Sequence, residues 1–411
     1  MNTRPLPLKA QPAAPTAHNA RRLLAIVGIL LVAANLRAAV AALSPIYDLI
    51  SRSYLVSPQA QGVLGSLPAL AFALFGCCAP AINRRLGLER GIALAMLLVC
   101  AGDMGRAWLS GSVWSLGVFS LMALAGMGMA NVLLPATIKR YLPQRVGAMT
   151  AAYCIMSAIG AAAPSLLAVP VAHLFGWRVS VGAWSLLAVA AALPWLLLHR
   201  PQTAVQTARD SGLTRLALRW PQTWALVAVF AGGAWVMYAL LAWLPTILVQ
   251  TAHVAPAHAG AMLALYSLVG LAHNLVVPNL LATTRRPERI VIVAAACTVI
   301  GTLGLAYCPQ LALLWVIPAG LGAMAITIGL TLINLRSRTE SGTTALSGVM
   351  QASGYLIAAA GPWITGKLYA ISGGWLLPFW LMAVTGVLIG FAGFAATRQG
   401  YLEDRAAQAH S

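Results

Sequence analysis

The sequence predicts an all-α, polytopic membrane protein. Of its 411 residues, 60% are hydrophobic and only 8% are charged, whereas soluble domains carry roughly 25% charged residues. Apolar runs of about 20 residues recur along the whole chain, and each is long enough to cross the hydrocarbon core as a helix. The alternation of period two that is typical of an outer-membrane barrel is missing from these runs.

Reading the apolar runs between charged residues and Pro or Gly breaks predicts twelve membrane-spanning helices. We expect them at 22–47, 59–82, 91–109, 113–138, 146–172, 179–198, 222–249, 258–281, 288–307, 310–334, 344–369 and 375–397.

The cations predict which side each loop faces. Twenty-one of the 26 lysines and arginines fall in the tails and in alternate loops. The other five, which lie within helices or toward the opposite side, are Arg37, Arg52, Arg106, Arg178 and Lys367. Cytoplasmic loops are enriched in Lys and Arg, so we expect both termini in the cytoplasm of a bacterial inner-membrane protein. The net charge of +18 then reflects topology and contact with anionic lipids, and we expect no nucleic-acid partner.

The two groups of six helices match each other in sequence. A shift of 198 residues places "IGAAAP" (159–164) on "IAAAGP" (357–362) and "GW" (176–177) on "GW" (374–375). Two parallel repeats imply a pseudo-twofold axis along the membrane normal, with a substrate site near mid-membrane between them. This is the architecture of the major facilitator fold.

The same pattern divides the chain into segments that we expect to be separate units. They are a disordered cytoplasmic tail (1–20), an N-terminal six-helix bundle (21–198), a cytoplasmic linker (199–221), a C-terminal six-helix bundle (222–397) and a second cytoplasmic tail (398–411).

Within that superfamily the chain resembles the cyanate / 2-nitroimidazole transporter family over nearly all of both halves. The blocks that carry the resemblance include "ANLRAAVAALSPIYDLI", "GMGMANVLLPATIKRYLPQRVGAMT", "WLPTIL", "LTLINLRSRT" and "SGYLIAAAGPWITGKLYAISGGW". The loop after the second helix departs from the superfamily signature, because "NRRLGLER" has Arg84 where an Asp normally precedes the Arg. Any cytoplasmic gate must therefore work differently here, and we consider Glu89 as its acid. The other gating candidates are Arg84, Arg85, Arg90, Lys139 and Arg140.

Arg37 is the principal candidate for binding substrate. It lies 15 residues beyond Arg22, or about 22 Å along a helix, and a charged residue inside a membrane helix is a functional hypothesis by default. Two interpretations stay open. The guanidinium either snorkels to the outer headgroups or pairs with Asp48, or it faces a central cavity and holds an anion by charge-assisted hydrogen bonds. The resemblance includes this Arg and favours the second.

Further polar and aromatic residues are candidates for the same cavity. Thr327, Thr331 and Asn334 form a stripe at i, i+4 and i+7. The repeat maps Arg37 onto Trp235, so we expect a cation to face an indole across the pseudo-axis, although a packing role for Trp235 is a rival interpretation. The remaining substrate candidates are Asn131, Tyr153, Tyr238, Gln351 and Tyr355.

His273, in the middle of its predicted helix, is the candidate for proton transfer because its ordinary pKa lies near neutrality, with a structural role as the alternative. Uniport and exchange therefore stay open beside proton symport. No P-loop, nucleophile triad or metal-ligand cluster is visible in the sequence, so we expect neither an enzyme nor a cofactor or metal site.

These observations predict a monomeric secondary or facilitative transporter for a small, anionic or planar polar solute, working by alternating access. An exporter of apolar drugs, dominated by Trp235, Tyr238 and Tyr355, is the alternative, and a non-transporting membrane sensor is a third class.

Overall fold

A computed structural model describes residues 15–198, 211–398 and 400–404. Within these ranges the chain forms helices and connecting turns, and no strand. The expectations of disorder for 1–20, of a linker for 199–221 and of a tail for 398–411 fall partly outside these ranges.

Eight helices and a π-helical turn form the described part of the first half of the chain. They are α1 (Pro15–Ala41), α2 (Tyr47–Ser51), α3 (Pro58–Leu86), α4 (Leu88–Met104) with the π-turn Gly105–Leu109, α5 (Val113–Tyr141), α6 (Val146–Phe175), α7 (Trp177–Gly182) and α8 (Trp184–Leu197).

The short helix α9 (Ser211–Arg219) precedes the second half. That half comprises α10 (Pro221–Thr251), α11 (Pro256–Thr283), α12 (Pro287–Tyr307), α13 (Ala312–Gly322), α14 (Met324–Leu335), α15 (Glu340–Ser372) and α16 (Leu376–Ala396).

Eleven spans in the described part of the chain are long and apolar enough to cross a membrane. The expected span at 344–369 corresponds to α15, which is 33 residues long, about 50 Å at the usual helical rise. Its first half is rich in Ser, Thr and Gly, so it falls outside the apolar set.

Three expected helices are interrupted. The helix expected at 22–47 stops at Ala41 and continues as a 3-10 turn (Ser44–Ile46) and α2, because Pro45 has no amide hydrogen to continue the ladder. The helix expected at 179–198 is divided between α7 and α8, and that expected at 310–334 between α13 and α14.

Two helices extend into segments that were expected to be a tail and a linker. Helix α1 begins at Pro15, inside the segment expected to be a disordered tail, and proline is well suited to the first turn of a helix. Helix α9 lies inside the expected linker, and it is held by the apolar side chains of Leu213, Leu216 and Ala217, which pack on the core of the second half.

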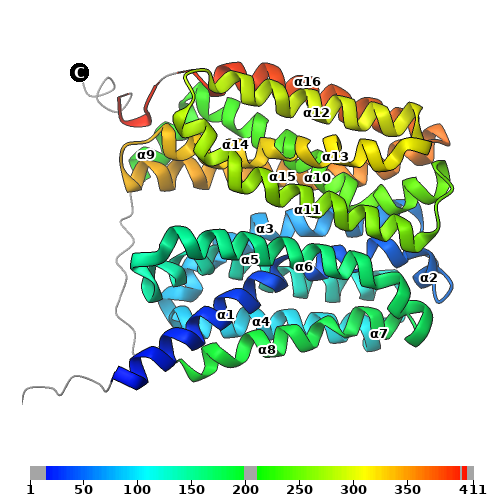
Figure 1. The fold of residues 1–411 in the computed structure, drawn as a ribbon, viewed down its shortest axis with the longest axis horizontal. Coiled ribbons are helices and arrows are strands. Elements are labelled where there is room, and N and C mark those ends of the chain that lie inside the picture. Colours follow the sequence, from blue (N-terminus) through cyan, green and yellow to red (C-terminus); the bar gives the residue numbers. More distant parts are fainter. Residues whose placement is uncertain (1–14, 199–210, 399, 405–411) are drawn as a thin grey trace, which may run out of the picture.

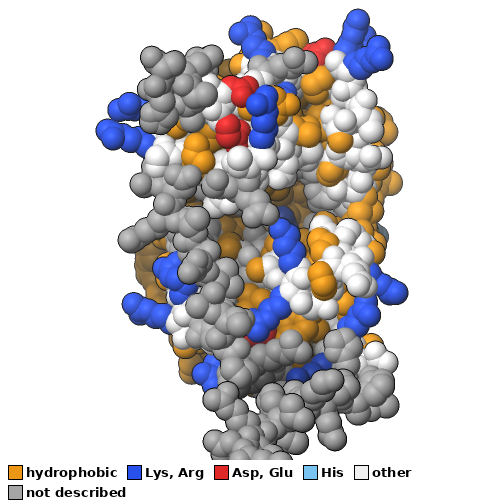
Figure 2. All heavy atoms as spheres, turned by 90° about the vertical axis from the view of Figure 1, so that its left-hand side faces the viewer, with side chains coloured by type: hydrophobic (Ala, Val, Ile, Leu, Met, Phe, Trp, Pro, Cys, Tyr) orange, Lys and Arg blue, Asp and Glu red, His pale blue; other side chains and the backbone are white. Residues whose placement is uncertain are grey.

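The two halves lie side by side with their helices roughly parallel (Figure 1). The start of α1, helix α9 and the end of α16 lie at one end of the molecule, which we call the terminal face. The turn containing Pro45, α2 and α7 lie at the other, which we call the distal face. Lysines and arginines gather over the terminal face (Figure 2), as the distribution of cations along the sequence predicts.

The halves are sealed together toward the distal face. Helix α3 packs on α10 and α15, and α6 packs on α11. The Gln61 side chain donates to the Ala242 carbonyl over 3.3 Å and to the Thr246 hydroxyl over 3.1 Å. A Cβ on Gly65 would lie 2.5 Å from the Cβ of Ala242 and 2.9 Å from that of Pro362. Glycine is therefore required where α3 crosses α10 and α15.

On the terminal face, residues 400–404 dock on the turn between α14 and α15. Glu403 Oε1 accepts hydrogen bonds from the hydroxyls of Ser337 and Thr339 and from the amides of Arg338 and Thr339. Arg338 also pairs with Asp404 at 2.9 Å. Partial burial by itself would raise the pKa of Glu403, but these hydrogen bonds outweigh it and lower the pKa to about 2.

We predict that Glu403→Ala releases this docked segment. Hydrogen bonds to a charged group contribute roughly 1.5–3 kcal/mol, so amide exchange at Arg338 and Thr339 should accelerate by roughly 10- to 100-fold in hydrogen–deuterium exchange. Because the pKa of Glu403 is lowered, docking of the wild-type segment is complete above the ordinary carboxyl pKa and weakens as the pH falls toward 2.

Glu288→Ala, on a different turn of the same face, is the matched control. Unchanged exchange at Arg338 and Thr339 in Glu403→Ala would show that the carboxylate does not hold the segment.

Candidate functional site

A cavity of about 500 Å³ lies between the two halves, on the terminal side of the distal seal. Helices α1, α3, α5 and α6 of the first half line it, together with α10, α11, α13, α14 and α15 of the second. A concave site between structural repeats is where ligands are expected to bind. Seven of the sequence candidates line it: Arg37, Asn131, Tyr153, His273, Thr327, Gln351 and Tyr355.

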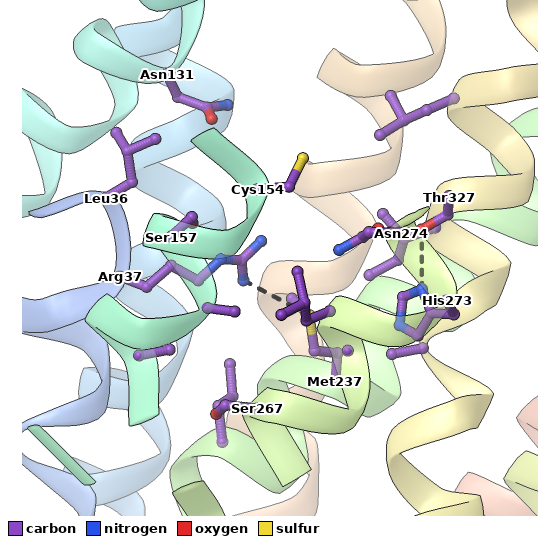
Figure 3. A pocket seen from close by; sticks show the side chains of 18 of the residues that line it. Leu36, Arg37, Asn131, Cys154, Ser157, Met237, Ser267, His273, Asn274 and Thr327 are labelled. Atoms are coloured by element: carbon purple, nitrogen blue, oxygen red, sulfur yellow. Dashed lines mark hydrogen bonds between the residues drawn. The ribbon is translucent and has the colours of Figure 1, made fainter. Parts of the chain in front are cut away.

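Arg37 reaches into this cavity from α1, four residues before the helix ends. The side chain is half-buried, and Nη1 donates to the sulfur of Met237 on α10 over 3.7 Å. Figure 3 shows the guanidinium extending toward Met237 and the second half. A thioether is a weak acceptor, and the lining of the cavity, within the described residues, includes no carboxylate. The guanidinium is therefore available to an anion.

The expected pairing of Arg37 with Trp235 does not occur. Trp235 is 7% exposed and does not line the cavity, because its indole lies over Gly361 of α15. Met237 is two positions further along α10, about 200° around the helix, and therefore occupies the place expected for the indole. The alternative pairing of Arg37 with Asp48 is not observed either, and the side chain of Asp48 is exposed.

A buried ion pair anchors the same end of α1. Asp103 and Arg106 are both fully buried and form a salt bridge at the junction of α4 and the π-turn, as their spacing of three residues predicts. Arg106 Nη1 also donates to the carbonyl of Ala39 over 2.9 Å. Because Ala39 follows Arg37 by two residues, this pair fixes the segment from which Arg37 enters the cavity.

Asn35, next to Arg37 on α1, serves a different purpose. Its side chain is fully buried and donates to the Leu187 carbonyl of α8 over 3.2 Å. Asn35 therefore joins two helices of the first half and leaves the cavity to Arg37.

Polar groups of α5 and α6 form the rest of the first half's wall. The Tyr153 hydroxyl donates to Asn131 Oδ1 over 3.3 Å, and Cys154 and Ser157 lie beside them (Figure 3). Pro135, one turn after Asn131, extends this wall toward the terminal face.

The candidates on α10, α14 and α15 differ in their access to the cavity. Gln351 lines it and donates to Ser347 over 2.6 Å, and Tyr355 lines it with its ring 5.0 Å from that of Phe230. Tyr238 is 1% exposed and packs behind Tyr355 at a ring distance of 6.4 Å. Thr331 donates to the backbone of its own helix and does not line the cavity.

Three polar side chains of the second half form a connected cluster, which we call the polar triad: His273 and Asn274 of α11 and Thr327 of α14. His273 Nδ1 lies 3.1 Å from Thr327 Oγ1, and the Thr327 hydroxyl donates to Asn274 Oδ1 over 2.5 Å. All three line the cavity on the side opposite Arg37 (Figure 3).

The gating candidates all lie on the terminal face of the first half. Glu89 is buried and accepts a hydrogen bond from the Tyr141 hydroxyl over 2.6 Å, and Arg140 lies 3.5 Å from the same oxygen. These contacts join α4 to α5 within one half. Arg84, Arg85, Arg90 and Lys139 are exposed around this group.

Several lining residues were not among the sequence candidates. Asn274 could have been found, because it lies beside His273 in the sequence. Phe72, Met237 and Tyr266 carry no signal in the sequence, because apolar and aromatic side chains are common on every membrane helix.

Comparison with known proteins supports the architecture. The family model described as "Major Facilitator Superfamily" matches residues 27–347. A 2-nitroimidazole transporter of Escherichia coli (strain K12) is 34% identical over 92% of this chain and 96% of its own. The cyanate transport protein CynX of the same strain is 27% identical over 90% of this chain and 97% of its own.

A crystal structure of a mutant of the nucleoside transporter NupG superposes with a TM-score of 0.75. It covers 92% of this chain and 100% of that one, at 14% sequence identity. At this identity the likeness concerns the fold alone.

We predict that Asp103→Ala destabilises the protein strongly. Removing one partner of a buried ion pair leaves an uncompensated charge and costs about 3–5 kcal/mol. The thermal unfolding midpoint in detergent should fall accordingly.

The double variant Asp103→Leu/Arg106→Met replaces the pair by apolar side chains and serves as the matched control. We expect it to unfold closer to wild type than Asp103→Ala does. If the double variant is the less stable of the two, the unpaired charge is not the cause.

Proposed function

The chain belongs to the Major Facilitator Superfamily, and from that membership we propose that it transports a small, anionic or planar polar solute through the cavity that holds Arg37. The family and the eleven apolar spans make it a multi-pass membrane transporter. The choice of an anionic or planar solute rests on the cavity.

Arg37 is the observation that carries the proposal. A guanidinium between membrane helices is costly unless it meets an opposite charge or water, and here its hydrogen-bond acceptor among the described residues is a thioether. A carboxylate or similar anion would supply charge-assisted, bidentate hydrogen bonds. The names of the relatives, a 2-nitroimidazole transporter and a cyanate transport protein, are compatible with small planar solutes.

We further propose a bacterial inner-membrane location with the terminal face in the cytoplasm. Cations gather on that face (Figure 2), as the positive-inside rule requires. The cavity lies on the cytoplasmic side of the distal seal, so this conformation would be inward-facing. Alternating access would open the contacts of α3 with α10 and α15 and close the terminal face.

The alternative, an exporter of apolar compounds, depends on aromatic residues that face the cavity. Of its three principal aromatics only Tyr355 lines the cavity, whereas Trp235 and Tyr238 are buried behind it. Phe72, Tyr153 and Tyr266 also line the cavity, so the choice rests on Arg37. Its guanidinium meets no carboxylate among the described lining residues, and this favours the anion.

Replacing Arg37 tests the anion site. In proteoliposomes, Arg37→Ala should raise the Km for a transported small carboxylate roughly 10- to 100-fold, because a hydrogen bond to a charged group contributes roughly 1.5–3 kcal/mol. Arg37→Lys should fall between Ala and wild type, since it keeps the charge and loses the planar fork.

Arg52→Ala removes an exposed arginine near the distal face and controls for the loss of charge. An unchanged Km in correctly folded Arg37→Ala would contradict the anion site.

We propose uniport or exchange rather than proton symport. Carboxylates are missing from the described lining of the cavity, and Asp103 is held in an ion pair with Arg106. With an anion that does not titrate near neutrality, an imposed gradient of about one pH unit should change the initial rate less than twofold.

The expectation would be contradicted if a pH gradient drove the wild type to accumulate the anion and His273→Gln abolished that accumulation. That result would identify His273 as a proton relay.

A further inference from the structure

The polar triad faces Arg37 across the cavity and presents a specific pattern of donors and acceptors (Figure 3). The pattern follows from the hydrogen bonds within the triad. A threonine hydroxyl has one hydrogen, and that of Thr327 is donated to Asn274 Oδ1. The Thr327 oxygen must therefore act as the acceptor toward His273 Nδ1.

This assignment fixes the tautomer of His273. With its hydrogen on Nδ1, the neutral imidazole has an acceptor lone pair on Nε2. A second proton on Nε2 would add another cation to a cavity that already holds Arg37 and whose described lining has no carboxylate. Like charges in one site oppose each other, so the neutral form is favoured.

His273 Nε2 is an acceptor without a partner. The residue is 7% exposed, and Nε2 makes no hydrogen bond within the described structure. Gly270, one turn earlier on α11, also lines the cavity, and a Cβ there would lie 3.7 Å from Nε2. Glycine at this position leaves no side chain beside Nε2. Nε2 itself is buried and has no donor, and a buried acceptor that lacks a donor is costly.

Asn274 contributes the complementary group. Its carbonyl oxygen is taken by Thr327, so the amide NH₂ is the end that remains for a ligand. Figure 3 shows that nitrogen directed into the space between the triad and Arg37. The second half thus offers an acceptor beside a donor, and the first half offers a cation.

Given the proposed function, we propose that the substrate is a small planar anion with its own N–H or O–H donor at the end opposite the charge. Arg37 binds the anionic end. His273 Nε2 accepts the hydrogen bond from the substrate's donor, and Asn274 donates to a neighbouring acceptor atom. Anions that carry acceptors alone leave Nε2 unpaired and bind more weakly. His273 is therefore a specificity residue.

A matched pair of ligands tests this assignment. Pyrazole-4-carboxylate has a carboxylate at one end and adjacent N–H and N atoms at the other. In 1-methylpyrazole-4-carboxylate a methyl group replaces the hydrogen of the donor. Sites built to bind an N–H reject analogues that lack it far more strongly than they reject a change of one methyl group. In titration calorimetry the wild type should bind the first ligand at least about 30-fold more tightly than the second.

Two substitutions of His273 separate recognition from folding. In His273→Asn the amide NH₂ can still donate to Thr327, but nothing replaces Nε2, so the two ligands should bind within about threefold of each other. In His273→Gln the longer side chain can place an amide oxygen near the position of Nε2, and part of the preference should return. Thermal unfolding midpoints near that of the wild type will show that both variants are folded.

The outcomes distinguish this proposal from the proposed function. If both ligands bind the wild type equally, and both depend on Arg37, the donor assignment is overturned while the anion site stands. A preference that survives in His273→Asn also overturns the role of His273. If neither ligand binds the wild type, both proposals fail.

Discussion

A guanidinium held among membrane helices, with a thioether as its acceptor, is the constraint around which this protein is arranged. Arg37 lies half-buried in the cavity between the halves, and its Nη1 contacts the sulfur of Met237. Such a charge is tolerated where water or an anion can reach it. Arg37 therefore needs the cavity, because the cavity is where water or an anion can reach its guanidinium.

The surrounding structure fixes where that charge lies. The buried pair Asp103–Arg106 reaches the Ala39 carbonyl and so holds the end of α1, while Asn35 fixes the same helix to α8. The close crossing of α3 with α10 and α15 at Gly65 shuts the cavity toward the distal face. If one half rocks against the other to open that seal, Arg37 moves with the first half and the polar triad moves with the second. The binding of a ligand that contacts both Arg37 and the polar triad would therefore depend on the relative position of the halves.

The sequence determined the helical class, the spans and the cation-rich face, because these depend on composition summed over many residues. It did not determine the breaks within spans at Ala183 and Ala323, since no proline marks either break and such breaks depend on packing. Arg37, Asn131, Tyr153, Gln351 and Tyr355 were expected to share one cavity because polar residues in apolar helices are rare. His273 was expected as a proton relay only. Trp235 was expected in the cavity from the repeat. Aligning the two repeats cannot distinguish positions that are two residues apart on a helix. In the structure Met237, two residues after Trp235, lies in the cavity instead.

The central claim is that an anion binds at Arg37, and locating one is the most direct measurement. Crystals of the wild type soaked with a brominated small aromatic carboxylate would show the bromine by anomalous diffraction. The account predicts a peak inside the cavity, with the carboxylate within hydrogen-bonding distance of the Arg37 guanidinium, and no peak in Arg37→Ala. A peak outside the cavity, or one that persists in Arg37→Ala, would contradict it.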